Sequence, residues 1–201
     1  MREGGAVTAR SVDQAPRGTN SITTEKKMAT KQEWPDRVHR VFGEMAIRRV
    51  SYVPDVGLTK LLKLCHADRK MKTVVLTTEE EGVAMAAGAW LAGERAALLM
   101  QSSGVGNCIN MLALAQNYRF PLLMLVMMRG QWGEINPGQV PMGQGTARAL
   151  ESVGVVVQTV DDADAVEENV RKGAEFAFNT NTATALLITQ RVVGAKKWSK
   201  R

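Results

Sequence analysis

Six short apolar runs recur along this sequence, with helix-like segments between them. The runs cover residues 50–53, 73–76, 96–101, 121–127, 154–160 and 183–189. Several of them, such as Pro121–Met127, are apolar throughout instead of alternating between apolar and polar residues. Strands of a parallel sheet that is covered on both faces have this composition. The sequence therefore predicts an α/β fold, a three-layer, doubly wound, six-stranded parallel sheet with helices on both faces.

Composition divides the 201 residues into three parts. Residues 1–33 are rich in Gly, Ser, Thr, Arg and Gln without an apolar period, so we expect a disordered extension. Residues 34–190 form the predicted domain, and residues 191–201 form a basic tail. Met28 lies just before the domain, and we hypothesise that natural translation starts there. An intact-mass measurement that finds residues 1–27 on the native protein would refute this hypothesis.

The net charge of +6 lies at the ends of the chain. Residues 1–33 carry +2 and residues 191–201 carry +5, whereas residues 34–190 carry −1. No basic stripe continues from the tail into the domain, so nucleic acid is not an expected partner. No apolar run approaches the roughly 20 residues of a membrane span, and no signal-peptide segment follows Met1. We expect a cytoplasmic protein that does not bind membranes.

The two cysteines, Cys65 and Cys108, each have apolar neighbours. Their spacing fits neither a zinc site nor a redox pair, so we expect buried free thiols in a reducing compartment. The histidines and acidic residues also lack the spacing of a metal site. We predict no metal ligand in this chain.

Three consecutive carboxylates, Glu79 to Glu81, follow the predicted strand 73–76 and begin a helix that is otherwise rich in Ala and Gly. The N-terminus of a helix carries partial positive charge, which favours anions in its first turn. One interpretation is that all three side chains only complement this dipole, since acidic first turns are common. The other interpretation is that at least one carboxylate lies at a strand-to-helix corner beside a buried surface, where it binds a ligand.

Two glycine-rich stretches follow later strands. Ser102–Asn107 is predicted to be a glycine loop that leads into a helix ending near Asn117. Arg129–Gln144 is predicted to be a long irregular loop before a helix that starts at about Thr146. Loops of this length in a compact domain tend to be functional. Ligands of doubly wound sheets bind beyond the carboxyl ends of the strands, so we expect both loops and the acidic turn to share one edge.

Two other chemistries fit the glycine loop less well. Gly104 and Gly106 could present backbone N–H groups to a phosphate. However, position 109 is Ile where a dinucleotide fingerprint has its third glycine, and the chain has no P-loop motif. The loop's serines could act as nucleophiles only with a base, and neither histidine of the chain belongs to a motif that would aim it at them.

Four segments together resemble a known family. They are Val53-Pro54-Asp55, Glu79 with Gly88 nine residues later, Met100–Asn107 (Met-Gln-Ser-Ser-Gly-Val-Gly-Asn) and Arg129-Gly130. Over about residues 36–190 the chain is similar to the pyrimidine-binding domain of thiamine-diphosphate decarboxylases. The Glu-to-Gly spacing is shared by the wider superfamily. The Gln-Ser-Ser-Gly-x-Gly-Asn segment and Arg-Gly are more specific to the sulfopyruvate and phosphonopyruvate decarboxylases.

This resemblance implies the thiamine-diphosphate pyrimidine-binding domain fold and a catalytic role for Glu79, which would hydrogen-bond the aminopyrimidine ring of the cofactor. A carboxyl group facing a buried heterocycle has its charged form disfavoured by desolvation, so it can share a proton with the ring nitrogen. The cofactor then acts as an electron sink while carbon dioxide leaves a 2-oxo acid. The residues implied to line the cofactor cleft are Gln101, Ser102, Ser103, Gly104, Gly106 and Asn107.

The resemblance also implies a partner chain. In these enzymes Mg²⁺ holds the diphosphate on a second domain with a Gly-Asp-Gly motif, which this sequence lacks. We therefore expect a beta-type subunit that binds most of the thiamine diphosphate and the Mg²⁺, with the active site at the interface. Arg129 is the candidate for the substrate's sulfonate or phosphonate, because a guanidinium suits a polyoxygen anion. The alternative for Arg129 is a structural contact with the carbonyl groups of its own loop.

The expected activity is therefore that of an alpha subunit of a decarboxylase, which converts sulfopyruvate to sulfoacetaldehyde and carbon dioxide. The nearest alternative substrate is 3-phosphonopyruvate. Two rival functions come from other classes. One is a non-catalytic binding or scaffold domain of the same fold, and the other is a flavodoxin-like module that binds a mononucleotide without a second protein.

Overall fold

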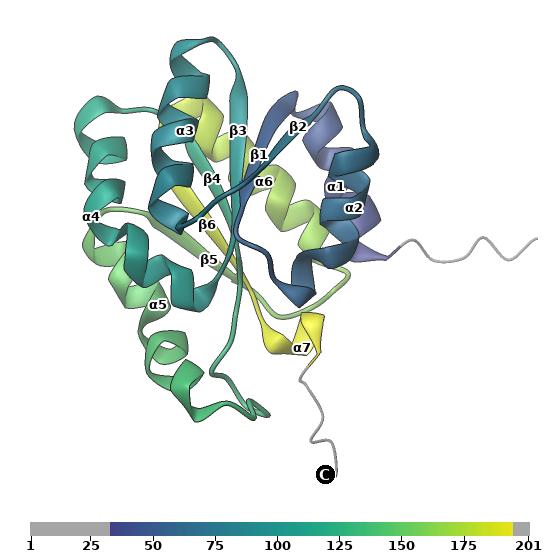
Figure 1. Cartoon of the computed structure of the whole chain (residues 1–201), viewed down its shortest axis with the longest axis vertical. Helices are drawn as coiled ribbons and strands as arrows, with labels where there is room; N and C mark the ends of the chain where they lie inside the picture. The colour runs from purple at the N-terminus through teal and green to yellow at the C-terminus, as the bar shows by residue number, and fades with distance from the viewer. Residues whose placement is uncertain (1–32, 195–201) are drawn as a thin grey trace, which may run out of the picture. The chain divides into compact units, whose positions relative to one another are not determined.

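The computed structural model describes residues 33–194, in which strands and helices alternate (Figure 1). Residues 1–32 of the expected extension, with Met28 among them, and most of the basic tail lie outside these residues. The strands are β1 (Ile47–Tyr52), β2 (Lys72–Val75), β3 (Arg95–Gln101), β4 (Leu122–Met127), β5 (Val156–Val160) and β6 (Ala183–Ile188). The helices are α1 (Trp34–Glu44), α2 (Thr59–Ala67), α3 (Glu79–Leu91), α4 (Ser102–Tyr118), α5 (Val140–Ser152), α6 (Val166–Thr180) and α7 (Gln190–Val193), with 3-10 turns η1 (Val56–Leu58) and η2 (Pro137–Gln139).

The six strands form one sheet in the order β2-β1-β3-β4-β6-β5. Every neighbouring pair is parallel. The central strands β4 and β6 are buried along their whole length. The prediction of a six-stranded parallel sheet is therefore confirmed.

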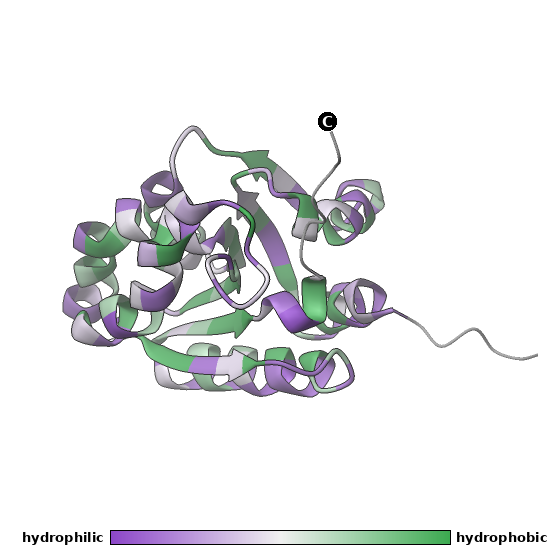
Figure 2. Ribbon diagram, turned by 90° about the horizontal axis from the view of Figure 1, so that it is seen from below, coloured by the Kyte–Doolittle hydropathy of each residue, from purple (hydrophilic) through white to green (hydrophobic). Residues whose placement is uncertain are grey.

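Alternate side chains of each central strand enter different cores. Leu99 and Leu125 pack with α1, α2 and α6 on one face of the sheet. Leu98 and Met124 pack with α3, α4 and α5 on the other face. Figure 1 shows these two helix layers, and in Figure 2 the strands between them carry long hydrophobic stretches. Because both faces are covered, the predicted doubly wound architecture is also confirmed.

The winding direction reverses between β1 and β3, which are neighbours in the sheet. The chain leaves β1 towards α2 on one face and leaves β3 towards α4 on the other. The two connections therefore diverge at the carboxyl ends of these strands, which is where doubly wound sheets bind their ligands. Among the described residues, no helix is both long and apolar enough to cross a membrane.

The predicted glycine loop Ser102–Asn107 is wrong, because these residues form the first turns of α4. Gln101 is extended and serves as the N-cap residue, so the helix begins directly at the end of β3. Gly104 and Gly106 are poor helix formers by propensity. Gly104 is nevertheless required here, because a larger residue would overlap with a side chain of α3.

The predicted loop Arg129–Gln144 is too long, since α5 begins at Val140 rather than near Thr146. Pro141 lies in the first turn, where the missing N–H is not needed for an intrahelical bond. A side chain at Gly143 would overlap with the carbonyl group of Arg129. The glycines and proline that suggested a loop therefore let the start of α5 pack directly against the segment after β4.

Candidate active site

The structure separates the three carboxylates at the start of α3. Glu79 is buried, with 6% of its surface exposed, and its Oε2 accepts a hydrogen bond from Asn107 Nδ2 at 2.8 Å. Glu81 is exposed, and its Oε2 accepts from the backbone N–H of Thr77 at 2.9 Å. Glu80 is exposed. Only Glu79 therefore lies at a buried strand-to-helix corner, as one of the two interpretations requires.

Glu79 lies against the first turn of α4. A methyl group at Gly104 would overlap with Glu79 Oε1, so the glycine makes room for this carboxylate. The position also places a negative charge near the positive end of the α4 dipole. The carboxylate occupies the space in which a phosphate would approach this helix end, which argues against the phosphate-binding alternative.

A hydrogen-bonded chain joins β1 and β3 across the point where the winding reverses. Ser103 Oγ donates to Gln101 Oε1 at 2.7 Å, and Gln101 Nε2 donates to Asp55 Oδ2 at 2.8 Å. Asp55 Oδ1 in turn accepts from the backbone N–H of Gly57 at 2.8 Å and caps η1. This chain fixes the side chain of Gln101 at the carboxyl edge of the sheet.

Ser102 is fully buried, and its Oγ accepts a hydrogen bond from the backbone N–H of Arg129 at 3.0 Å. It thereby ties the start of α4 to the segment after β4. Unlike Ser102, the predicted site residues Ser103, Gly106 and Asn107 are exposed on α4. The structure thus gives Ser102 a positioning contact and leaves its three neighbours open to a ligand.

Arg129 forms a two-point ion pair with Glu134 of its own loop. Its Nε and Nη2 donate to the two carboxylate oxygens of Glu134, each at 2.7 Å. Only 2% of the Glu134 side chain is exposed, and it also accepts from Gln190 Nε2 and from the backbone N–H groups of Gly130 and Asn136. The Arg129 guanidinium lowers the pKa of Glu134 to about 2, and the carboxylate raises the pKa of Arg129. The structural alternative for Arg129 is present, although its partner is a carboxylate rather than loop carbonyls.

A pocket of about 250 Å³ lies beside Arg129 at the carboxyl edge. Its wall combines the turn after β1, the segment after β4 and α7 with its C-cap residue. The lining residues are Asp55, Val56, Gly57, Arg129, Gln190, Val193 and Gly194. The lining of this pocket does not include Glu79.

The histidines do not contact the serines of α4. His66 is hydrogen-bonded to the hydroxyl groups of Tyr52 and Thr73. His39 Nε2 lies 3.2 Å from Asp68 Oδ2. This arrangement supports the rejection of a serine hydrolase.

The cysteines are both buried, as expected. Burial raises the pKa of each thiol to about 12, for Cys65 and for Cys108 alike. Among residues 33–194, no group of three or more His, Cys, Asp or Glu side chains could hold a metal ion.

Sequence reasoning assigned no role to three polar residues of this edge, although Asp55 belonged to a segment shared with the family. Glu134 is the only acidic residue between Arg129 and Gln144, and this isolation was a signal for a pair with the arginine. Asp55 follows a strand and a proline, a position that favours a capping turn. Gln190 gave no signal, because its bonds to the loop after β4 depend on the placement of β6 beside β4.

Comparison with known proteins identifies the family. Residues 36–135 match the family described as "Thiamine pyrophosphate enzyme, N-terminal TPP binding domain". The chain is also 38% identical to sulfopyruvate decarboxylase subunit alpha of Methanothermobacter thermautotrophicus, over 68% of this chain and 83% of that protein. The chain belongs to the thiamine pyrophosphate enzymes. Its described domain is thus the pyrimidine-binding domain that the resemblance suggested.

Other thiamine pyrophosphate enzymes are longer than this chain. Sulfopyruvate decarboxylase of Methanosarcina acetivorans is 31% identical over 64% of this chain, which spans 33% of that protein. A solved structure of 2-oxoglutarate:ferredoxin oxidoreductase from Magnetococcus marinus superposes with a TM-score of 0.67. It shares 16% identity and covers 81% of this chain and 29% of its own, so it supports the fold alone.

The groups around Glu79 fit a bound aminopyrimidine. Oε2 accepts a hydrogen bond from Asn107, and within residues 33–194 this is the hydrogen bond that the Glu79 carboxylate makes. A buried carboxylate with one free oxygen can accept a hydrogen bond from an N–H group of a ring that enters the cleft. Glu79 and Asn107 are therefore the residues of this chain that would contact the pyrimidine.

Proposed function

We propose that this chain is the alpha subunit of a thiamine-diphosphate-dependent 2-oxo-acid decarboxylase that converts sulfopyruvate to sulfoacetaldehyde and carbon dioxide. The observation that carries this proposal is the burial of Glu79 at the start of α3, with one carboxylate oxygen free. The family membership and the name of the Methanothermobacter relative support the reaction.

Glu79 would hold the aminopyrimidine ring of bound thiamine diphosphate through a hydrogen bond and would share a proton with it. The cofactor, when bound, supplies the electron sink that allows carbon dioxide to leave the 2-oxo acid. Asn107 orients the carboxylate through its 2.8 Å hydrogen bond to Oε2, and Gly104 lets the carboxylate approach α4. The low polarity around a buried carboxylate strengthens its hydrogen bond to the ring.

The cofactor cleft is lined by the exposed side of the start of α4. Gln101, Ser103, Gly106 and Asn107 supply its surface, whereas Ser102 and Gly104 hold the elements in place from within.

A beta-type subunit completes the site. We assign to it the diphosphate and the Mg²⁺, because this chain has no Gly-Asp-Gly motif. The Methanosarcina relative, whose length is about three times the matched part, supports a complete enzyme that needs more chain than this one. The active site then lies at the interface, where the partner presents the cofactor to Glu79.

Arg129 is proposed to bind the sulfonate of the substrate. Its Nε and Nη2 are held by Glu134, so Nη1 is the atom left for an anion in the adjoining pocket. Replacement by Lys should raise KM for sulfopyruvate more than KM for pyruvate, which has no sulfonate. An equal effect on both substrates would leave Arg129 only its structural role.

Comparing kcat/KM for sulfopyruvate and 3-phosphonopyruvate decides between the two substrate classes.

Glu79→Gln in the reconstituted two-chain complex tests the function. Loss of the proton-exchanging group should lower kcat by about 100-fold or more, since general acid–base groups contribute on the order of 10² to 10⁴. Glu80→Gln is the matched control, because Glu80 is an exposed carboxylate of the same helical turn. Near-normal activity of Glu79→Gln at saturating cofactor would refute the role. A scaffold function predicts no decarboxylation by the wild-type complex either.

A further inference from the structure

The carboxylate of Glu134 organises the segment after β4 around the side chain of Arg129. Within residues 33–194, its donors are the Arg129 guanidinium, backbone N–H groups of its own segment, and one side chain from elsewhere in the fold, Gln190, whose Nε2 lies at 3.0 Å. The backbone donors are Gly130, Ile135 and Asn136. The amide of Gln190 therefore joins this carboxylate to the rest of the described domain.

Two further hydrogen bonds tie Gln190 to the same segment. The backbone N–H of Gln131 donates to Gln190 Oε1, and the backbone N–H of Gln190 donates to Gln131 Oε1, each at 2.9 Å. Only 6% of Gln190 is exposed, so these bonds are shielded from water. Because α7 begins at Gln190, shortly after β6, the end of β6 fixes the position of the segment relative to the sheet.

Helix α7 also contacts the opposite wall of the pocket beside Arg129. A Cβ at Gly57 would lie 2.7 Å from Val193 Cγ1, so the turn after β1 packs closely against α7. Val193, Gln190 and Arg129 line the same pocket of about 250 Å³. Through these contacts α7 connects the two walls of the pocket, and it fixes the place of Arg129 relative to the turn after β1.

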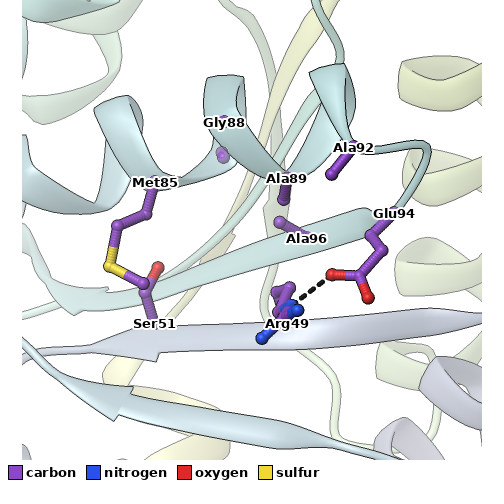
Figure 3. Close-up of a pocket in the computed structure, with 9 residues that line it drawn as sticks. Arg49, Ser51, Met85, Gly88, Ala89, Ala92, Glu94 and Ala96 are labelled. Carbon is purple, nitrogen blue, oxygen red and sulfur yellow. Dashed lines mark hydrogen bonds and ion pairs between the residues drawn. The ribbon is translucent and has the colours of Figure 1, made fainter.

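A second arginine–glutamate pair of this protein is held much less firmly. In Figure 3 the pair Arg49–Glu94 lies at one end of the hollow of about 220 Å³ between α3 and β1. Its side chains are 33% and 35% exposed, whereas those of Arg129 and Glu134 are 15% and 2% exposed. Exposed pairs gain little from one fixed geometry, but a buried two-point pair holds its guanidinium in a defined direction.

We infer that Gln190 is a positioning residue for substrate recognition, because it holds Glu134 in the place from which Arg129 presents Nη1 to the pocket. The inference rests on the proposed function, in which Arg129 binds the sulfonate of the substrate. Gln190 acts on the guanidinium only through Glu134. Asp55 is the other charged residue of the pocket lining, and its oxygens already accept hydrogen bonds from β3 and from the turn after β1.

Gln190→Leu in the reconstituted two-chain complex removes both side-chain hydrogen bonds of this residue. We expect KM for sulfopyruvate to rise by about tenfold, the factor that corresponds to one hydrogen bond to a charged group. The binding of pyruvate, measured as a substrate or as a competitive inhibitor, should weaken less because pyruvate has no sulfonate. Gln116→Leu is the matched control, since Gln116 is an exposed residue near the other end of α4 whose Nε2 donates to the carbonyl group of Gly154.

Gln190→Glu keeps the shape of the side chain and makes the contact with Glu134 depend on pH. Two carboxylates this close repel each other, which raises the pKa of one of them, and the protonated group can then donate to the other as the amide does. Arg129, Glu134 and Asp55 are the charged residues of this network and pocket. Relative to the wild type at the same pH, the rise in KM for sulfopyruvate should therefore shrink as the pH is lowered. The effect of Gln190→Leu should not depend on pH.

The inference is supported if both variants weaken sulfopyruvate more than pyruvate and low pH relieves only Gln190→Glu. Equal effects on the two compounds, or a defect of Gln190→Glu that does not change with pH, would overturn it. If Gln190→Leu does not fold, Gln190→Glu decides, because it is compared with itself across the pH series. A wild-type complex that does not decarboxylate sulfopyruvate would refute the proposed function and the inference with it. An active wild type whose Gln190 variants behave like Gln116→Leu would refute the inference alone.

Discussion

The two helix layers of this protein differ in where they place charge. On α1 and α6, charged side chains bond one another across the gap between the helices, as in the pairs Arg40–Glu167 and Arg171–Glu44, each at 2.5 Å. On α3 and α4, the first turn of α3 contains three carboxylates and the rest of both helices contains none. The inner sides of the two layers are alike, since each forms a contiguous hydrophobic core with the sheet.

The charged layer keeps its outer surface hydrated at little cost. In the other layer, exposed apolar side chains such as Leu91 each leave surface in water at a cost of about 25 cal/mol per Å². The one buried carboxylate of the apolar layer, Glu79, is also the residue to which we assign catalysis. Substitutions in the apolar layer should therefore change activity and assembly, and those in the charged layer should change neither.

The largest expected effect comes from Gly104→Ala in α4. The added methyl group would overlap with the Glu79 carboxylate and displace it from Asn107. We expect kcat of the two-chain complex to fall by about 100-fold, as for loss of the acid–base group itself. Overpacking should also lower the free energy of unfolding by about 1–3 kcal/mol. Steady-state kinetics and chemical denaturation measure the two effects.

Gly145→Ala in α5, outside the proposed site, is the control for this change. Its Cβ would meet nothing within 4 Å. Folding should be unaffected or slightly improved, because Ala has the higher helix propensity. Equal losses of kcat in both variants would show that the Glu79–Gly104 contact is not the cause.

Glu134→Gln compares a buried ion pair with the exposed pairs of the charged layer. Glu134 has a pKa of about 2 in the folded protein, below its ordinary 4.5, so its ionisation stabilises the fold above pH 4.5. This stabilisation, about 3 kcal/mol, should be lost as the pH falls from 4.5 towards 2. The variant should be less stable than the wild type at pH 7, and the difference should shrink at acid pH. Urea titrations at several pH values measure it, and a difference that does not change with pH would contradict the assignment.

Most of the fold could be predicted from sequence because the apolar composition of the strands marks them without knowledge of the tertiary structure. A run such as Leu122–Met127 is apolar throughout, and only a strand covered on both sides needs that composition. The start of α4 could not be predicted, because Gly104 has low helix propensity and its need for a small residue depends on Glu79, 25 positions earlier in the chain. Local propensity was overridden there by a contact between helices.

The site was predictable in part for the same reason. The helix start drew attention to Glu79, Glu80 and Glu81 together, and the family resemblance then selected Glu79. The structure was needed to show that Ser102 faces inward and Asn107 outward. Arg129 was found as a cation, but its pairing with Glu134 depends on how the loop folds. Residue type thus indicated which chemistry was available, and packing decided which side chains remain free to use it.

Each layer also has one glycine where a helix touches the sheet, and these two positions compare the packing of the layers. A methyl group at Gly82 of α3 would overlap with Leu98, and it would lie 3.0 Å from Leu76 as well. At Gly173 of α6 the methyl group would meet one atom of Leu186 at 2.7 Å, and other atoms of that side chain at 3.5 Å. We expect Gly82→Ala to lower the free energy of unfolding by about 1–2 kcal/mol. Gly173→Ala should have a smaller effect, because a single leucine can move and Ala favours the helix. Thermal and urea unfolding of both variants test the order, and the reverse order would mean that α6 packs more tightly than α3.

The smallest effect is expected from Arg171→Ala in the charged layer. Arg171 pairs with Glu44 and Glu167 on the surface, and the carboxylates raise its pKa. Exposed ion pairs contribute little, because each charge is well hydrated without its partner and salt screens the attraction. The melting temperature should therefore fall less than for Glu134→Gln, and the remaining difference should vanish in 1 M NaCl. The mass of the assembled protein and kcat should match the wild type. A change in either would mean that the charged layer also takes part in assembly, and the contrast between the two faces would no longer hold.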